Sequence, residues 1–397
     1  MTNETKNVPE LRFPEFDGEW EENKINKFLK ESIIVGSKGN KAKKLTVKLW
    51  GKGVVPKKEV HSGSNNTQYY IRKNGQLMYG KLDFLNCAFG IVPYELDGYE
   101  STIDSPAFDI IDGEPKFILE KIKQKSFYKK YGERANGSRK AKRINQNDFL
   151  DMTIYSPKYF EQKKIGQFFS KLDRQIELEE QKLEKLEEQK KGYMQQIFSQ
   201  HFRFKDENEN KYEKWRKIKL ANILKERKTY LSKSSGVAHA TLSTEGIYLK
   251  NERYDRDFLV KDKNKKYKVS FKDDICYNPA NLKFGVITRN DIGKVIFSPI
   301  YITFEVNQNY NPLFMEMMLT RWDFINKVRK FEEGTVYERM AVKPEDFLSY
   351  ETYIPCLEEQ EKIGNFFNDL DKFIEKQSNK IELLKERKRG FLQKMFV

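Results

Sequence analysis

Apolar residues recur at alternating spacings of four and three along two long stretches of the chain, 165–197 and 363–395. This heptad pattern predicts two long helices that pack along an apolar seam. Each helix would run for about 38 residues, or about 57 Å, which is too long for a lone surface helix. Polar residues interrupt both seams at matched places, which are Glu179 and Lys190 in the first and Gln377 and Lys388 in the second. We therefore predict that the two helices pair with each other as an antiparallel coiled coil.

The two stretches are also copies of each other. The segment from Pro157 to Phe198 aligns without a gap with the segment from Pro355 to Phe396, at a constant offset of 198 residues, and about 20 of the 42 positions are identical. The likeness extends upstream, because NDFLDMTIYSP at 147–157 matches EDFLSYETYIP at 345–355, and LRF at 11–13 resembles FRF at 202–204. A period of this length indicates that the repeating unit is half of the chain, a globular segment followed by a helix.

The globular segments have a different pattern, with short apolar runs broken by Gly, Asn, Pro and Asp. Such runs predict short strands and turns, with helical pieces near 213–224 and 311–331. We predict an α+β fold in which two globular domains with twisted, largely antiparallel sheets are separated by the two antiparallel helices, in a pseudo-two-fold arrangement. The predicted boundaries are 1–156 for the first domain, 157–200 for the first helix, 201–354 for the second domain and 355–397 for the second helix.

The formal net charge of +15 indicates a polyanionic partner or a basic background. Each helical segment carries nine Lys/Arg against eight Asp/Glu, so about +13 of the excess lies in the globular segments, where a phosphate-binding surface is expected. The chain has no apolar run of about 18 residues and no secretory signal, so we expect a cytoplasmic protein. Three widely spaced cysteines indicate neither a disulfide framework nor a zinc site.

Residue types that bind DNA gather in three stretches of each globular segment. Arg and Lys can bond guanine, Asn and Gln can bond adenine, and small hydroxyl residues can position phosphates. The candidates in the first segment are Lys38, Lys41, Lys43, Lys44, Arg72, Lys73, Asn74, Ser138, Arg139, Lys140 and Arg143. Those in the second are Lys228, Tyr230, Lys233, Ser234, Asn281, Lys283, Arg289, Thr335, Tyr337 and Arg339. The alternative for each basic run is a solvated loop without a ligand.

No motif for catalysis accompanies these residues. The chain lacks a GxxxxGK[ST] phosphate loop, an HExxH pair and a nucleophile elbow, and its three histidines show no metal-ligand spacing. The NPA sequence at 278–280 is only a faint likeness of the NPPY of amino-methyltransferases, without a glycine-rich cofactor loop before it. We therefore expect a protein that reads another molecule and has no catalytic, metal or cofactor site of its own. A coiled-coil scaffold that binds only proteins is the alternative.

The order of globular segment, helix, globular segment, helix resembles the specificity subunit of type I restriction-modification systems. The resemblance covers the whole chain. It is carried by LRFPEFDGEW at 11–20, by the start of each helix (Pro157–Ile176 and Pro355–Ile374) with its shared EQ, KIG, FF and LD, and by the GSRK and GTVYER sequences at 137–140 and 334–339.

This resemblance implies two target-recognition domains, each reading one half of a split, asymmetric DNA site, with the paired helices setting the gap between the halves. It also implies two modification subunits that methylate adenine and two restriction subunits that act as motor-nucleases. S-adenosylmethionine, ATP and Mg would then belong to those partners. By the same resemblance, candidate contacts to the modification subunits are Gln162, Lys164, Phe168, Gln360, Lys362 and Phe366.

Overall fold

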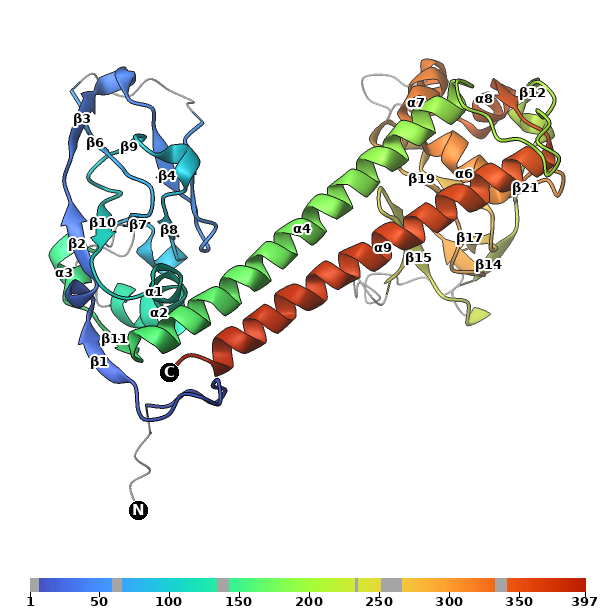
Figure 1. The fold of residues 1–397 in the computed structure, drawn as a ribbon. Helices are drawn as coiled ribbons and strands as arrows, with labels where there is room; N and C mark the ends of the chain where they lie inside the picture. The colour runs from blue at the N-terminus through green and yellow to red at the C-terminus, as the bar shows by residue number, and fades with distance from the viewer. Residues whose placement is uncertain (1–6, 59–65, 134–142, 233–234, 251–265, 333–340) are drawn as a thin grey trace. The chain divides into compact units, whose positions relative to one another are not determined.

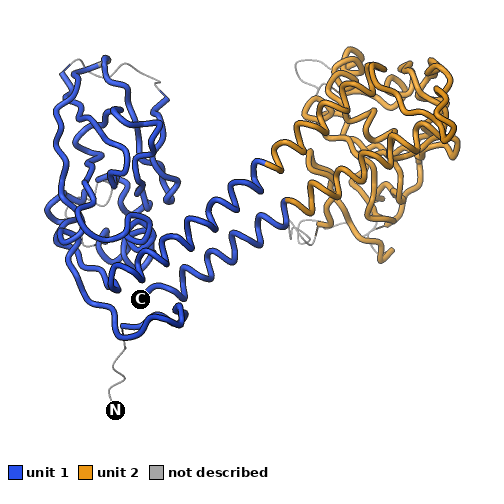
Figure 2. Tube along the Cα trace, viewed as in Figure 1, with its two compact units in different colours: residues 1–181, 378–397 blue, residues 182–377 orange. Residues whose placement is uncertain are grey.

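A computed structural model of the chain describes residues 7–58, 66–133, 143–232, 235–250, 266–332 and 341–397. The chain divides into two compact units (Figure 2): unit 1 comprises Met1–Gln181 with Ser378–Val397, and unit 2 comprises Lys182–Gln377. Each unit therefore combines one globular segment with a portion of both long helices.

Among its described residues, unit 1 has short strands, three short α-helices before its last strand, and parts of both long helices (Figure 1). The strands are β1 (Glu21–Lys24), β2 (Leu29–Ser32), β3 (Val35–Lys38), β4 (Leu45–Val47), β5 (Val54–Pro56), β6 (Gln68–Ile71), β7 (Leu77–Tyr79), β8 (Phe89–Ile91), β9 (Glu100–Ser101), β10 (Ala107–Ile110) and β11 (Thr153–Ser156). The helices are α1 (Pro115–Ile122), α2 (Lys125–Gly132), α3 (Gln146–Leu150) and the first part of α4 (Tyr159–Phe198).

Unit 2 repeats this order after the end of α4. Its strands are β12 (Arg216–Lys219), β13 (Leu224–Glu226), β14 (Tyr230–Ser232), β15 (Ala240–Ser243), β16 (Gly246–Leu249), β17 (Lys266–Ser270), β18 (Ile275–Tyr277), β19 (Ile287–Arg289), β20 (Val295–Phe297), β21 (Ile302–Val306) and β22 (Glu351–Ile354). Its helices are α6 (Pro312–Thr320), α7 (Trp322–Val328), α8 (Pro344–Ser349) and the first part of α9 (Leu357–Lys394).

The sheets of the two units have the same connections. Unit 1 has a four-stranded sheet in the order β2-β10-β7-β8, a three-stranded sheet β3-β6-β9, and the pairs β1-β11 and β4-β5. Unit 2 has β13-β21-β18-β19, β14-β17-β20, β12-β22 and β15-β16. All of these pairings are antiparallel. The predicted α+β class, with small antiparallel sheets and long helices, is confirmed.

Both long helices are continuous across their glycines, since α4 includes Gly192 and α9 includes Gly390. Their pairing is antiparallel: near the start of α4, Phe168 packs edge-on against Phe391 of α9, with ring centroids 5.0 Å apart. In unit 2, Tyr193 packs in the same way against Phe366, at 5.3 Å. The predicted coiled-coil pairing is thus present in each unit.

Three polar residues of the seam form ion pairs with the opposite helix. Lys388 lies 2.5 Å from Asp173, and the equivalent Lys190 forms an ion pair with Asp371. Glu179 forms an ion pair with Lys380. Polar residues within a coiled-coil seam favour one register over others, so these ion pairs select the antiparallel register. None of the helices among the described residues has the length and apolarity needed to cross a membrane.

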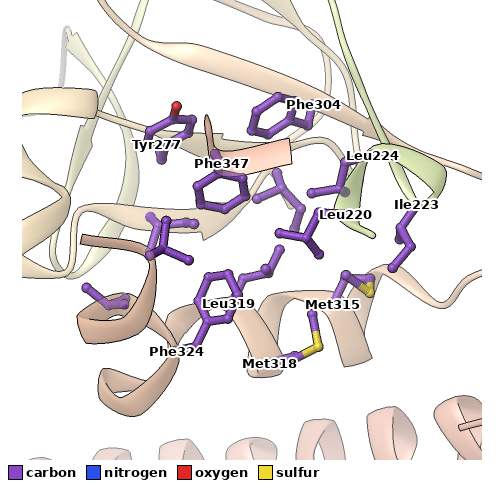
Figure 3. Packing of buried hydrophobic residues seen from close by; sticks show 14 of the residues in the cluster. Leu220, Ile223, Leu224, Tyr277, Phe304, Met315, Met318, Leu319, Phe324 and Phe347 are labelled. Carbon is purple, nitrogen blue, oxygen red and sulfur yellow. The ribbon is translucent and has the colours of Figure 1, made fainter. Parts of the chain in front are cut away.

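An aromatic trio lies at the centre of each unit. In unit 2, Tyr277, Phe304 and Phe347 stack on one another with centroids 5.0–5.7 Å apart, over apolar side chains of α6 (Figure 3). In unit 1, Tyr79 stacks on Phe108 at 5.9 Å and packs on Phe149 at 4.6 Å. Fully burying one such ring contributes about 1.5–3 kcal/mol, so these trios join the four-stranded sheet to the helix that precedes β11 or β22.

The helix predicted near 213–224 is wrong. This segment forms β12, a short 3-10 turn (Leu220–Asn222) and β13. Its apolar residues resemble a helical pattern, but Arg216 pairs with Ile354 and Leu224 pairs with Val306. Partners this far along the chain override local propensity. The helical prediction for 311–331 is confirmed by α6 and α7.

Candidate nucleic-acid interface

Sheet β3-β6-β9 brings the first two basic stretches of unit 1 together. Lys38 ends β3 opposite Gln68, and Arg72 directly follows β6. Lys38, Lys41 and Lys43 are exposed to solvent. These three lysines are therefore available to a phosphate backbone.

Two predicted cations of unit 1 have internal roles instead. Arg72 is 2% exposed and donates hydrogen bonds to Ser101 Oγ at 2.7 Å and to the Ser32 and Ser105 carbonyls at 3.2 Å. Burial lowers the pKa of Arg72 to about 10, although Glu31 and Tyr70 oppose this shift. Lys44 is also buried, with its ammonium 5.4 Å from the Tyr69 ring centroid. Both side chains hold this sheet together.

The remaining described candidates of unit 1 lie at turns. Lys73 and Asn74 are exposed, and their backbone N–H groups donate to Gln76 and Asp97, both at 2.8 Å. Arg143 is largely exposed, 3.7 Å from Asp104. Ser138, Arg139 and Lys140 lie outside the described residues.

In unit 2 the predicted residues lie on several elements. Lys228 and Tyr230 are exposed on or beside β14, and Asn281 and Lys283 lie in the 3-10 turn Pro279–Phe284. Arg289 is bound within the unit, since it donates to Glu316 at 3.1 Å and to Asp273 at 2.8 Å. The predictions at Lys233, Ser234, Thr335, Tyr337 and Arg339 lie outside the described residues.

The neighbouring aspartate of the same turn binds a second arginine. Asp274 accepts two hydrogen bonds from Arg227, at 2.8 and 2.9 Å. Burial raises the pKa of Asp274, against the effect of Arg227. The turn between β17 and β18 thus holds two arginines in place. Within the described ranges, no group of His, Cys, Asp and Glu side chains could hold a metal ion.

The repeated start of each long helix forms a junction with the chain that precedes β1 or β12. Glu161 is 2% exposed and accepts hydrogen bonds from Arg12 at 2.7 and 2.8 Å. The equivalent Glu359 is fully buried and accepts from Arg203 at 2.5 and 3.1 Å. In each unit, the arginine of the LRF or FRF sequence therefore forms an ion pair with the buried glutamate of the long helix.

A glutamine directly follows this glutamate in each copy. It connects the long helix to a shorter helix that comes earlier in the same unit. Gln162 accepts from the Glu114 N–H at 3.1 Å and donates to the Pro157 carbonyl at 2.8 Å. Gln360 makes the same two bonds, with the Asn311 N–H at 2.9 Å and the Pro355 carbonyl at 2.9 Å. Glu114 and Asn311 are the N-caps of α1 and α6. This bond fixes the start of one helix against the start of another.

The shared glycine makes room for those N-caps. A Cβ atom at position 166 would lie 1.9 Å from Glu114 Oε2, and one at position 364 would lie 2.9 Å from Asn311 Oδ1. Both distances are too short for a side chain. The repeated KIG sequence is therefore explained by helix packing within each unit.

The other residues predicted to contact partner subunits also have neighbours inside their unit. Lys164 forms an ion pair with Glu15, and Lys362 donates to the Lys205 carbonyl at 2.8 Å. Phe168 packs on Phe13 with centroids 6.0 Å apart, and Phe366 packs on Phe204 at 5.6 Å. Contacts within each unit account for these shared positions, so the repeat does not by itself require a second protein. Their contact with another subunit stays a prediction.

The sequence interpretation missed the hairpin formed by β4 and β5. Its exposed side chains include Lys48, Lys52, Lys57 and Lys58, and Trp50 is 62% exposed at its turn. A count of charges would have found it, because the segment 36–58 has eight lysines and no acidic residue.

Comparison with known proteins finds a family match for part of the chain and a similar fold for nearly all of it. Residues 110–188 match the family described as the type I restriction modification DNA specificity domain. The fold is similar to that of the type I restriction-modification S subunit from M. genitalium, with a TM-score of 0.58 and 14% identity over 98% of this chain and 99% of that one.

Weaker likenesses extend over similar lengths. The HsdS subunit from Thermoanaerobacter tengcongensis has a TM-score of 0.47 and 14% identity, over 95% of this chain and 96% of that one. A chain from a structure of type I R-M complex assembly and conformational transition has a TM-score of 0.48 and 13% identity, over 95% and 97%. Residues 110–188 thus match the type I restriction modification DNA specificity domain, and the fold of the whole chain is similar to that of the type I S subunit from M. genitalium.

Proposed function

We propose that this chain is the DNA sequence-specificity subunit of a type I restriction-modification complex. One observation carries the proposal: the family match over 110–188 runs from the end of β10 into α4, and the same elements with the same junction recur about 198 residues later. The recurrence supports the same role for unit 2, so we assign one recognition domain to each unit. Each would read one half of a bipartite, asymmetric DNA site.

The exposed cations support duplex DNA as the ligand. Lys38, Lys41, Lys43, Lys73 and Lys228 are exposed, in a chain of net charge +15. Such lysines bind phosphates and set affinity, whereas sequence is read by side chains at base edges. The subunit has no catalytic role of its own in this proposal. Two modification subunits and two restriction subunits would supply methylation and cleavage, and would hold S-adenosylmethionine, ATP and Mg.

The paired helices are proposed to set the spacer between the half-sites. Two readers can meet one side of a duplex when their half-sites lie about one turn, or ~34 Å, apart. Helices of 40 and 38 residues have lengths of about 60 Å and 57 Å at 1.5 Å per residue. Their pairing through Lys190–Asp371 and Lys388–Asp173 supports one fixed register.

Methylation mapping tests the recognition role. The chain would be co-expressed with its modification subunit in a host without DNA methylation, and the DNA sequenced for methyladenine. We expect one split motif, methylated on both strands. An assembled complex that leaves DNA unmethylated would contradict the proposal.

Helix length tests the spacer role. Removing 178–184 together with 376–382 deletes one heptad from each helix, at positions that face each other through Glu179 and Lys380. We expect the same half-sites with a shorter gap. Removing 178–184 alone is the control, because it breaks the register and should abolish methylation. Altered half-sites with an unchanged gap would exclude the helices as the spacer.

One observation favours the alternative of a protein-interaction scaffold. A cavity of about 800 Å³ in unit 2 lies between the end of α4 and the α6–α7 junction, lined by Phe198, Arg321 and Trp322 among others. Trp322 is 58% exposed, and the Arg321 guanidinium lies 4.1 Å from the centre of the Phe198 ring. Duplex binding that weakens steeply with added salt would favour the reader over the scaffold, because phosphate contacts release counterions.

A further inference from the structure

The β4–β5 hairpin of unit 1 combines dense positive charge with an exposed indole. All charged residues in the segment 36–58 are lysines. Those nearest its turn, Lys48 and Lys52, are exposed, and Trp50 between them is 62% exposed. An exposed tryptophan flanked by lysines can bind nucleic acid, because the indole can stack on the flat face of a base while the lysines pair with phosphates.

Trp50 adopts a backbone conformation that its own side chain disfavours. Its φ is +61°, in the left-handed region that glycine occupies without cost. Four other described non-glycine residues have positive φ, at positions 87, 200, 209 and 273, and none of them is aromatic. A bulky residue kept in this conformation and left in water contributes little to the fold, which points to a role outside it.

The turn is held firmly in place. The Trp50 N–H donates to the Asn86 carbonyl at 2.8 Å, and the Gly51 N–H donates to the Cys87 carbonyl at 2.7 Å. The backbone of Gly53 lies so close to β8 that a Cβ atom on Gly90 would be 2.9 Å from Gly53 Cα. The indole is thus presented by a fixed turn, which lowers the entropy lost when it binds.

The equivalent hairpin of unit 2 lacks both features. β15 and β16 are joined through Thr244 and Glu245, and the segment 240–249 contains neither lysine nor tryptophan. The basic, aromatic turn is therefore particular to unit 1.

We propose that the β4–β5 turn contacts the DNA duplex, with Lys48 and Lys52 binding phosphates while Trp50 stacks on a base face at an opened base step. This inference rests on the proposed function and assigns the first unit a contact that the second does not make. Insertion of an apolar side chain between bases bends a duplex, so the half-site read by unit 1 would be the distorted one.

Binding to a mixed-sequence duplex of about 40 base pairs, about four helical turns, tests the contact in the full chain assembled with its modification subunit. Trp50→Ala should weaken binding about 5- to 150-fold, the range expected for one stacked base, and leave the salt dependence unchanged. Replacing Lys48 and Lys52 by alanine should lower the slope of log affinity against log salt by about 2. Tyr94→Ala is the matched control, because Tyr94 is 78% exposed in the same unit but lies beside Glu95.

Fluorescence gives an independent measurement. Trp20 and Trp215 are buried, so in a Trp322→Phe protein Trp50 is the exposed tryptophan. DNA should quench the Trp50 emission and protect it from quenching by acrylamide. Adding Trp50→Phe should remove both changes. Trp50→Gly should lose DNA affinity while raising the unfolding temperature, because glycine relieves the strained φ.

The outcomes separate this inference from the proposed function. If the wild type binds the duplex and Trp50→Ala binds equally well, the stacking contact is refuted and the recognition role stands. If Trp50→Ala instead blocks assembly with the modification subunit, the turn is a protein contact and the inference fails. If the wild-type complex does not bind the duplex, both fail.

Discussion

The equivalent helices α1 and α6 differ at two adjacent positions, where α1 has charged, buried side chains and α6 has apolar ones. In α1, Glu120 and Lys121 are 1% and 5% exposed. Alignment of the two helices from their first prolines places Met317 and Met318 of α6 at these positions. Both helices nevertheless begin with the same N-cap geometry and the same bond from a glutamine of a long helix. The repeat thus retains its junctions and allows the bodies of its helices to diverge.

In unit 1, the buried carboxylate of Glu120 has ion-pair partners but does not have all of its hydrogen bonds. Glu120 lies 2.9 Å from Lys116, 3.1 Å from Lys123 and 4.0 Å from Lys388. Burial raises the pKa of Glu120, but these lysines outweigh burial and the net pKa is lowered. Its Oε2 atom has no hydrogen-bond partner within the described residues. Buried ions of this kind are often less stabilising than apolar residues of the same volume, so unit 2 has the more stable arrangement at this place.

The junction should show the largest effect. Glu359→Ala leaves Arg203 without its partner and should destabilise unit 2 by about 3–5 kcal/mol. Glu161→Ala should cost less, because Glu359 also accepts from Trp215 Nε1 at 3.2 Å whereas Trp20 Nε1 has no partner among the described residues. Hydrogen exchange of amides at the start of each long helix measures both. Glu361→Ala, at an exposed neighbouring position, is the control. Equal losses of stability in the two units would show that the hydrogen bond from Trp215 to Glu359 does not stabilise unit 2.

The shared glycine comes next. Gly166→Ala should cost about 1–3 kcal/mol, because its Cβ would displace the Glu114 carboxylate from the N-cap of α1. Gly364→Ala should cost less, since the nearest atom is farther away. Adding Glu114→Asn to Gly166→Ala gives unit 1 the shorter cap of unit 2 and should recover part of the loss in denaturant unfolding. No recovery would mean that the clash involves other atoms.

Lys121→Met gives α1 the residue of α6 and should stabilise unit 1 by about 1–2 kcal/mol near neutral pH. Burial, reinforced by Lys130, lowers the pKa of Lys121 from 10.5 to about 8. The unfolded chain thus binds this proton more tightly, so the free energy of unfolding should rise as pH increases from about 8 to 10.5. When urea unfolding is measured at several pH values, the Lys121→Met variant should not show this rise in the free energy of unfolding. Lys125→Met, at an exposed position of α2, should change neither quantity.

The seam ion pairs should show the smallest effect and a difference between units. Asp371→Asn should cost below about 1 kcal/mol, because its pair with Lys190 is partly exposed. Asp173→Asn should cost more: burial raises the pKa of Asp173, but hydrogen bonds from Lys116 and Lys388 outweigh it and lower the pKa. The Asp173 contribution is present above the unfolded pKa and is lost as pH falls through the lowered value. Thermal unfolding of both variants at neutral and acid pH measures the difference, and identical profiles would contradict it.

Sequence periodicity was sufficient for the long helices. The heptad seam predicts both, and the matched interruptions at Lys190 and Lys388 indicate their pairing because isolated polar seam positions fix the register of a coiled coil. Composition also indicated where the net positive charge lies. These features are local or repeat at a fixed offset, so a single sequence contains them.

Assignment of single residues is least certain from sequence where contacts with distant parts of the chain decide which side chains are exposed. Arg72 and Arg289 belong to basic stretches, yet both are bound within their units by Ser101 and Glu316 and their neighbours. No periodicity indicates such partners. Gln162 was predicted to contact another subunit, which stays untested, and the structure adds that Gln162 and Gly166 both adjoin the N-cap of α1. Repetition in the sequence identified the important positions, and geometry was needed to say what they contact.

The two central tyrosines have a consequence for evolution. Tyr79 donates from its hydroxyl to the Ile144 carbonyl at 2.9 Å, and Tyr277 donates to the Val342 carbonyl at 3.0 Å. Each bond fixes the backbone just after a stretch in which the sequence predicts DNA-reading residues, 133–143 and 332–340. Both bonds join described parts of the core, a strand of the four-stranded sheet and the chain that leads into α3 or α8. If each unit reads DNA as proposed, a new target sequence would need substitutions only outside this bonded core, so the core and the long helices could be inherited unchanged.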